Sequence, residues 1–226
     1  MIFGLEGLAA GMLALSAVSG GGQAITCKAA ALPPVRVEPS KSVIQYDHSL
    51  TQGQLDRMEI DTVNPYGDHK QTHVGGLMSG EITVEHQIGF VQERYDRLGV
   101  SCLYYDSVDV KININPTIYI ARENKPGSCR YNAILEHEKK HVEVDRLVVN
   151  KYARRIGESV SFALKQYGSS FGPFPVGEIA YAQERLQEYL GGVIKAEVDA
   201  MNEERRASQQ AIDTIQEYER VRRLCP

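Results

Sequence analysis

The feature that most constrains this chain is an H-E-x-x-H motif, formed by His137, Glu138 and His141 with two lysines between them. Residues four apart lie on one face of an α-helix, so the two imidazoles can bind one Zn²⁺ ion while Glu138 lies beside it. Apolar residues without Gly or Pro surround the motif from 131 to 156, which favours a helix. The motif therefore predicts a zinc site, and its alternative is a solvated helix face that binds no metal.

A zinc ion with two histidines and a third protein ligand keeps one coordination position for water and lowers the pKa of that water to about 7. Glu138 is the expected catalytic residue, because its carboxylate can accept the proton of the zinc-bound water. These residues together predict a zinc-dependent hydrolase.

A second long helical pattern, 176–222, follows a turn rich in Gly and Pro at 167–175. If the two helices form an antiparallel hairpin closed by this turn, Glu204 lies opposite Lys139 and faces the zinc helix. We therefore predict Glu204 as the third metal ligand, beside His137 and His141.

Alternatives to Glu204 remain open. Glu203 and Glu197 lie near it on the same helix, and Asp145 lies one turn beyond His141 on the zinc helix. We expect Asp145 to orient an imidazole rather than to bind the metal. His69 and His73 lie in a glycine-rich stretch and are expected to be loop residues away from the metal.

The fold class follows from the spacing of apolar residues, which has a period near two in the first half of the chain and a helical period in the second half. Alternating apolar residues between Glu81 and Ala121 predict four short strands, at 82–91, 100–105, 108–114 and 117–121. We expect an α+β fold, in which a small antiparallel sheet precedes a long antiparallel helical hairpin that carries the H-E-x-x-H helix. The last strand could add an extended peptide at its edge, or it could be an ordinary internal strand.

The domain boundaries follow from the N-terminal composition. Residues 5–18 are apolar and small residues follow to Ala24, which predicts a signal peptide over 1–24, although no Lys or Arg precedes the apolar run. A single domain is then expected at 25–226, mainly β over 25–128 and helical over 129–226. The protein would be exported, periplasmic or secreted, with no membrane span in the mature chain. A cytosolic protein whose apolar run is a first helix is the alternative.

The four cysteines suit an exported protein. Their even number favours two disulfides, and we predict the pairs Cys102–Cys129 and Cys27–Cys225. Four reduced thiols and a lipid-modified Cys27 are the alternatives.

The charge balance argues against a nucleic-acid partner, because 25 basic and 29 acidic residues give a net charge of −4 without a basic block. The chain also lacks a phosphate-binding loop motif and a dinucleotide-binding fingerprint.

The motif and a distant glutamate make the chain similar to gluzincin-like zinc metallopeptidases. That resemblance implies metal binding by His137 and His141 and a general base at Glu138. More narrowly, Y-D-H-S-L-T-Q-G-Q-L from Tyr46, the cysteine before V-D-V-K-I-N-I-N-P-T-I-Y-I, and I-L-E-H-E-K-K-H resemble a bacterial secreted family of predicted zinc-dependent proteases of unknown function, over residues 42–145.

The functional prediction is an exported zinc-dependent hydrolase, a metallopeptidase that acts on a peptide or protein substrate or on cell-wall material. The alternative is a non-catalytic envelope or adhesion module whose metal site is structural or vestigial. Loss of activity in Glu138→Gln with zinc retained would distinguish the enzyme.

Overall fold

The computed structural model describes residues 25–40, 43–59, 62–67 and 73–225. The predicted signal peptide and His69 lie outside this part of the chain. The elements, in chain order, are β1 (Val35–Pro39), β2 (Gln45–Asp47), α1 (Gln52–Leu55), β3 (Gly76–Tyr95), β4 (Val100–Ile120), α2 (Cys129–Tyr167), β5 (Ser170–Pro175), α3 (Ile179–Ile212) and α4 (Ile215–Arg223), with short 3₁₀ turns at Asp96–Leu98 and Val176–Glu178.

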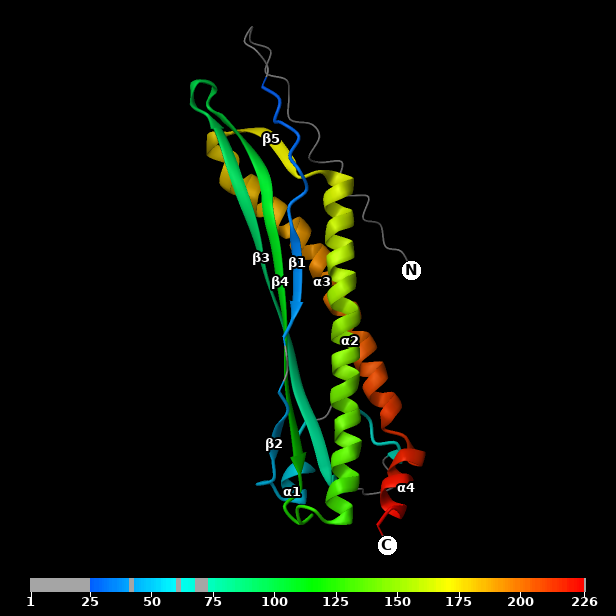
Figure 1. Cartoon of the computed structure of the whole chain (residues 1–226). Coiled ribbons are helices and arrows are strands. Elements are labelled where there is room, and N and C mark those ends of the chain that lie inside the picture. Colours follow the sequence, from blue (N-terminus) through cyan, green and yellow to red (C-terminus); the bar gives the residue numbers. More distant parts are fainter. Residues whose placement is uncertain (1–24, 41–42, 60–61, 68–72, 226) are drawn as a thin grey trace.

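A long antiparallel hairpin of β3 and β4 runs along the length of the molecule (Figure 1). β3 occupies one edge of β4 along its whole length, from Gly76 opposite Ile120 to Tyr95 opposite Val100. Along the other edge, β5, β1 and β2 pair with successive parts of β4. β1 and β2 run parallel to β4, whereas β5 runs antiparallel to it.

The predicted fold class is therefore wrong. The sheet is neither small nor purely antiparallel, because the path β1–β4–β2 is parallel and the hairpin strands have 20 and 21 residues. The predicted helical hairpin also differs, since the sheet strand β5 lies between α2 and α3 and a separate helix α4 follows. The three strands predicted between 100 and 121 form one strand.

The alternation that predicted strands does place one face of β4 in the core. Val108, Val110, Ile112, Ile114, Ile118 and Ile120 are buried, and polar residues alternate with them. Pro116 does not interrupt the strand, because it lies between the stretches of β4 that pair with β1 and β2, where a missing N–H breaks no ladder bond. The segment 117–121, considered above as a peptide-binding edge, is internal, with β2 on one side and β3 on the other.

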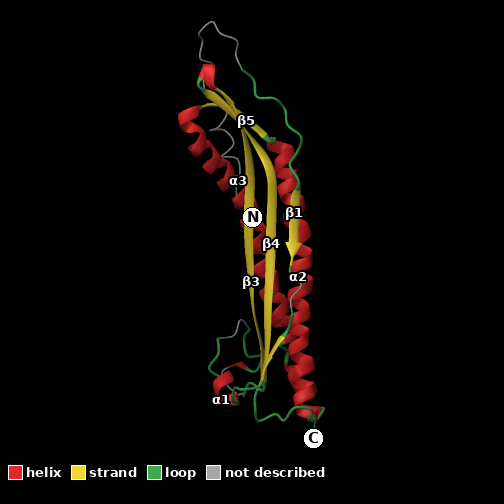
Figure 2. Ribbon diagram, turned by 60° about the vertical axis from the view of Figure 1, so that its left-hand side comes forward, coloured by secondary structure: helices red, strands yellow, loops and turns green. Residues whose placement is uncertain are grey.

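α2 packs along the sheet and α3 packs against α2 in the opposite direction (Figures 1 and 2). The Ser128 side chain caps α2 by accepting a hydrogen bond from the Tyr131 N–H. The apolar face of α2 packs against β4 and α3 to form the main core. Buried residues of this core include Val148, Tyr152 and Ile156 of α2 and Leu186, Leu190 and Ile194 of α3. None of the helices in the described part of the chain has the length and apolar character that crossing a membrane requires.

Two disulfides link parts of the chain that are distant in sequence, but not in the predicted pairs. Cys27 bonds to Cys102 in β4, and Cys129 at the start of α2 bonds to Cys225 just after α4. The prediction was wrong because it joined Cys102 to Cys129, which β4 separates by most of its length. Cys27 is in a disulfide, so its sulfur is not the site of a lipid.

Candidate metal centre

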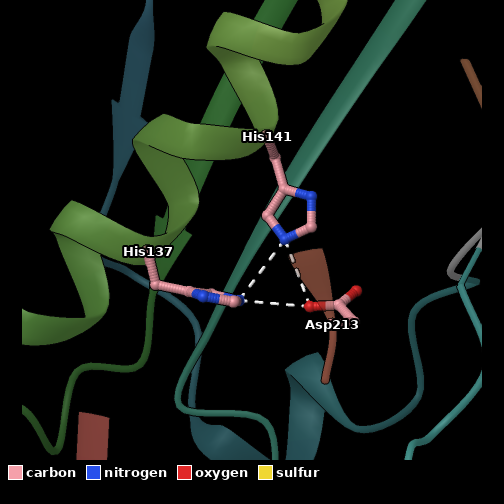
Figure 3. A group of neighbouring side chains, drawn as sticks. All are labelled: His137, His141 and Asp213. Carbon is pink, nitrogen blue, oxygen red and sulfur yellow. Dashed lines mark hydrogen bonds and ion pairs between the residues drawn. The ribbon is translucent and has the colours of Figure 1, made fainter. Parts of the chain in front are cut away.

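The two histidines of the motif project from successive turns of α2 and are almost fully buried, with exposed fractions of 8% and 7%. Helical spacing turns His137 and His141 to the same side, as the sequence predicts. Figure 3 shows both rings directed at Asp213, which approaches from the end of α3.

Asp213 reaches the histidines because the second helical pattern is interrupted at this residue. Ile212 ends α3, Asp213 has a non-helical backbone (φ −78°, ψ 71°), and α4 begins at Ile215 with Thr214 as its N-cap. The Thr214 side chain accepts a hydrogen bond from the Glu217 N–H. This cap starts a new helix and leaves Asp213 free to turn inward, where it is 6% exposed.

The three side chains form a nearly equilateral triangle of ligand atoms. Asp213 Oδ1 lies 3.2 Å from His137 Nε2 and 3.3 Å from His141 Nε2, and the two Nε2 atoms are 3.3 Å apart (Figure 3). A tetrahedral Zn²⁺ ion with bonds of about 2.0–2.1 Å would separate its ligand atoms by about 3.3–3.4 Å. These residues could therefore hold such an ion with little movement, with a fourth position left for another ligand.

The outer nitrogen of His137 faces a carboxylate. His137 Nδ1 lies 3.3 Å from Glu217 Oε1, and Glu217 also accepts hydrogen bonds from Lys140 and Arg220. The Arg220 guanidinium, together with Lys140, holds the pKa of Glu217 well below its usual range. Because an ionised carboxylate accepts hydrogen bonds only, Nδ1 carries the proton, and Nε2 of the neutral ring keeps its lone pair.

The outer nitrogen of His141 is fixed by Gln209. The Gln209 amide N–H₂ donates to the His141 carbonyl at 3.0 Å and to Asp145 Oδ1 at 2.6 Å, both of which are acceptors. Its carbonyl oxygen therefore faces His141 Nδ1, which must donate to it. In that tautomer, Nε2 of His141 also carries a lone pair, which points at the centre of the triangle.

Asp145 lies one step further from the metal position. It is fully buried, and Arg205 Nε donates to its Oδ1 at 2.7 Å. Arg205 also donates to the Gly80 carbonyl of β3, which ties this network to the sheet. Asp145 thus orients His141 through Gln209 and is not one of the three atoms that converge.

The convergence of three potential electron-pair donors suits a cation, which these residues could hold. Asp213 Oδ1 is buried and forms no hydrogen bond with any described residue, although both Nε2 atoms lie close to it. Without a positive charge among them, two lone pairs and a carboxylate oxygen at this separation would repel one another. A metal ion, or in its absence a proton on a histidine, satisfies all three.

The pKa values of the metal-free site reflect the same convergence. Burial lowers the pKa of both His137 and His141, but their interactions with Asp213 and Glu138 outweigh it, so both pKa values are raised. Burial opposes ionisation of Asp213, yet the two histidines hold the pKa of Asp213 below its ordinary value. The metal-free site therefore favours an ionised Asp213 carboxylate that faces a positive charge on the histidines.

Glu138 lies beside the triangle and is 4% exposed. The Met78 N–H of β3 donates to its carboxylate, and burial raises the pKa of Glu138 while the two histidines oppose that rise. Gly76 lets the strand approach, because a Cβ at this position would lie 3.1 Å from Glu138 Oε1 and would overlap Ile134. Glu138 is thus held between α2 and β3.

Glu204, the predicted third ligand, is not at the site. Its carboxylate accepts hydrogen bonds from Lys151 Nζ at 2.6 Å and Tyr152 Oη at 3.1 Å. Glu203 is exposed, and Glu197 pairs with Arg155 and Ser159. Asp213 takes the position for which Glu204 and these alternatives were considered.

The error lies in the register of the two helices. A tight turn would place residue 204 opposite Lys139, whereas the observed contact of Arg205 is with Asp145, a shift of about two helical turns. The shift arises because the segment between the helices joins the sheet as β5 and then forms a 3₁₀ turn. Tyr167 and Val176 are therefore not paired across a simple turn.

Four residues of the site escaped the sequence analysis: Gln209, Asp213, Glu217 and Tyr218. Tyr218 hydrogen-bonds to Asp213, and its ring lies edge-on to His137 with 5.7 Å between centroids. A signal was present, because Thr214 followed by Glu217 has the T-x-x-E spacing typical of a helix start. Such a start would have placed Asp213 outside any helix and next to a break.

His73, the second histidine of the predicted loop, lies away from the metal ligands. Its Nδ1 is 2.8 Å from Asp56 Oδ2, just after the short helix α1, whose N-cap is Thr51. It therefore holds the loop and does not join the metal ligands.

Comparisons with family models, with curated proteins and with solved structures found no match to this chain.

Proposed function

We propose that this protein is an exported zinc-dependent hydrolase whose metal ligands are His137, His141 and Asp213, and that it cleaves peptide bonds. The observation that carries the proposal is the triangle of two Nε2 atoms and one carboxylate oxygen, with edges of 3.2–3.3 Å and a buried Glu138 beside it. Nitrogen and oxygen ligands in a tetrahedral arrangement with one open position are typical of catalytic zinc.

A zinc ion bound by these residues would activate a water molecule and polarise a carbonyl group of the substrate. Glu138 would accept the proton of the water and later deliver it to the leaving amine. Burial raises the pKa of Glu138, a direction that suits a group that must both take and give a proton. Glu217 and Gln209 would hold the imidazoles in the tautomer that binds metal.

The compartment is part of the proposal. Two disulfides are typical of proteins from an oxidising environment such as the periplasm or the exterior of the cell. A peptide or protein, including the peptides of cell-wall material, is the substrate class that such an enzyme would meet there.

A second candidate function is a non-catalytic envelope module with a structural metal. The burial of the site favours it, since the three ligands are 6–8% exposed and structural zinc sites are closed to solvent. Only hydrolysis, and not zinc binding, separates the two candidates.

The test measures zinc content and peptide hydrolysis on the same preparations. Wild-type protein should contain one zinc per chain and cleave members of a peptide library, detected by mass spectrometry. Glu138→Gln should retain zinc and lose at least about 100-fold in rate, which is the usual contribution of a general base. Asp213→Ala should lose both zinc and activity, whereas Glu204→Gln should lose neither.

Three results would contradict the proposal in different ways. A wild-type protein that takes up no zinc has no metal centre. A protein that holds zinc but cleaves neither the library nor cell-wall peptides is the structural module. Hydrolysis by Glu138→Gln at the wild-type rate would assign the general base elsewhere.

A further inference from the structure

The C-terminal helix α4 supplies two residues that contact the metal ligands but contributes little to the core. Glu217 contacts His137, and Tyr218 hydrogen-bonds to Asp213, which directly precedes the cap of the helix. All nine residues of α4 are described, and none is buried. Val221 is partly buried against the small apolar cluster around Ile118 and Ile134.

Helices of this length are marginally stable on their own. Forming the first turn costs conformational entropy, and a helix of nine residues adds too few further hydrogen bonds to offset that cost. The contacts of α4 are mostly polar, including Glu217 with Lys140 and Glu219 with Tyr66. Besides the peptide chain that joins it to α3, α4 is attached by the disulfide between Cys225, just after the helix, and Cys129, the first residue of α2.

The two disulfides differ in accessibility. Cys129 is exposed and Cys225 is half-buried, whereas in the other disulfide Cys27 is half-buried and Cys102 has no exposed surface. A thiol reagent in solution can therefore reach the Cys129–Cys225 bond first. The start of β4, which contains Cys102, and the start of α2, which contains Cys129, lie at opposite ends of the long hairpin (Figure 1).

We propose that the Cys129–Cys225 disulfide controls the metal centre, so that its reduction weakens metal binding by releasing α4. A dithiol partner would reduce it by exchange: the S–S bond breaks, two thiols form on this chain, and the partner becomes a disulfide. Glu217 and Tyr218 would then no longer be held at His137 and Asp213. The inference rests on the proposed metal centre but not on the hydrolysis.

Loss of outer partners of metal ligands typically weakens metal binding about 10- to 100-fold. We therefore expect the zinc dissociation constant to rise by this factor in Cys129→Ser/Cys225→Ser, measured by competition with a chromophoric chelator. Wild-type protein reduced in stages and alkylated at each stage gives the same measurement without mutation. Alkylation also prevents the freed thiols from binding zinc themselves.

The linkage between metal and disulfide supplies an internal control. If zinc binds the α4-closed form more tightly, zinc must lower the equilibrium constant for reduction of Cys129–Cys225 by a dithiol, because the coupling between the two equilibria is reciprocal. Reduction of Cys27–Cys102 in the same molecules should not respond to zinc. Mass spectrometry of alkylated peptides follows both bonds at once.

The outcomes separate the two proposals. Weaker zinc binding after reduction of Cys129–Cys225 and zinc protection of that bond would support the inference. Equal zinc affinity of the oxidised and the reduced, alkylated protein would overturn it and leave the metal centre intact. Oxidised wild-type protein that binds no zinc would overturn the metal centre and the inference together.

Discussion

At the residue scale, the metal site is defined by where protons are placed on two imidazoles. Glu217 and Gln209 each present an acceptor to Nδ1, so that both Nε2 lone pairs meet at Asp213. The motif predicts the two histidines but says nothing of these acceptors, because they come from residues 68 and 80 positions away in the chain.

Replacing Glu217 by Gln should weaken zinc binding about 10- to 100-fold, because a neutral amide holds the His137 tautomer less firmly than a carboxylate does. Isothermal titration of zinc into metal-free protein measures the change. Glu136→Gln is the matched control, since Glu136 is 62% exposed and lies next to His137 in sequence. Equal losses in both variants would mean that a general loss of negative charge, and not the hydrogen bond, is responsible.

The stabilisation by zinc should increase with pH. In the metal-free protein, the pKa values of His137 and His141 are raised above 6.5, so their contribution to stability is complete below pH 6.5 and is lost as the pH rises through the folded-state values. Zinc binds the neutral rings and competes with these protons. The difference in Tm between zinc-loaded and metal-free protein should therefore be larger at pH 8 than at pH 6. A constant difference would show that the histidines do not exchange protons for metal.

At the scale of elements, the decisive feature is the break between α3 and α4. It turns Asp213 inward, and the capping hydrogen bond of Thr214 marks the start of the next helix. Thr214→Ala should cost about 1 kcal/mol of stability and also weaken zinc binding, because the loss of the cap loosens the segment that carries Asp213. Thr51→Ala removes a similar cap from α1 and should leave zinc binding unchanged. Thermal unfolding with and without zinc compares the two variants.

The close approach of β3 to α2 depends on Gly76. Gly76→Ala would place a Cβ against Ile134 and near Glu138, and we expect it to lower the free energy of unfolding by about 1–3 kcal/mol. Gly53→Ala is the control, because nothing lies within 4 Å of a Cβ at that position and alanine favours a helix. Denaturant unfolding gives both values. A neutral Gly76→Ala would mean that the strand can move away from the zinc helix without cost.

Local patterns predicted the elements better than their arrangement. The alternation along 108–121 correctly indicates which side chains of β4 are buried, and the apolar run around His137 correctly indicates a helix. The parallel pairing of β1 and β2 with β4 could not be predicted, because five- and three-residue strands carry no signal for their partner. The third ligand was misplaced for a related reason: the helix register depends on β5, whose pairing with β4 is a tertiary contact.

At the scale of the whole molecule, the two disulfides have separate tasks because the fold is long. β4 alone extends roughly 65 Å, with Cys102 near its start and the metal site beside its last residues, at the level of Ile118. Cys27–Cys102 attaches the segment before β1 to the sheet, whereas Cys129–Cys225 closes the end that contains the metal ligands.

Removing the distant bond should therefore affect stability without affecting the metal. In Cys27→Ser/Cys102→Ser, the loss of a cross-link between residues 75 apart should lower the free energy of unfolding by about 2–5 kcal/mol. The zinc dissociation constant of the folded variant should stay within about twofold of wild type, since no ligand or partner of a ligand lies near Cys102. Chelator competition below the unfolding temperature measures it. A large loss of zinc affinity in this variant would mean that the two ends of the sheet are mechanically coupled, and that stability at one end sets the geometry of the site at the other.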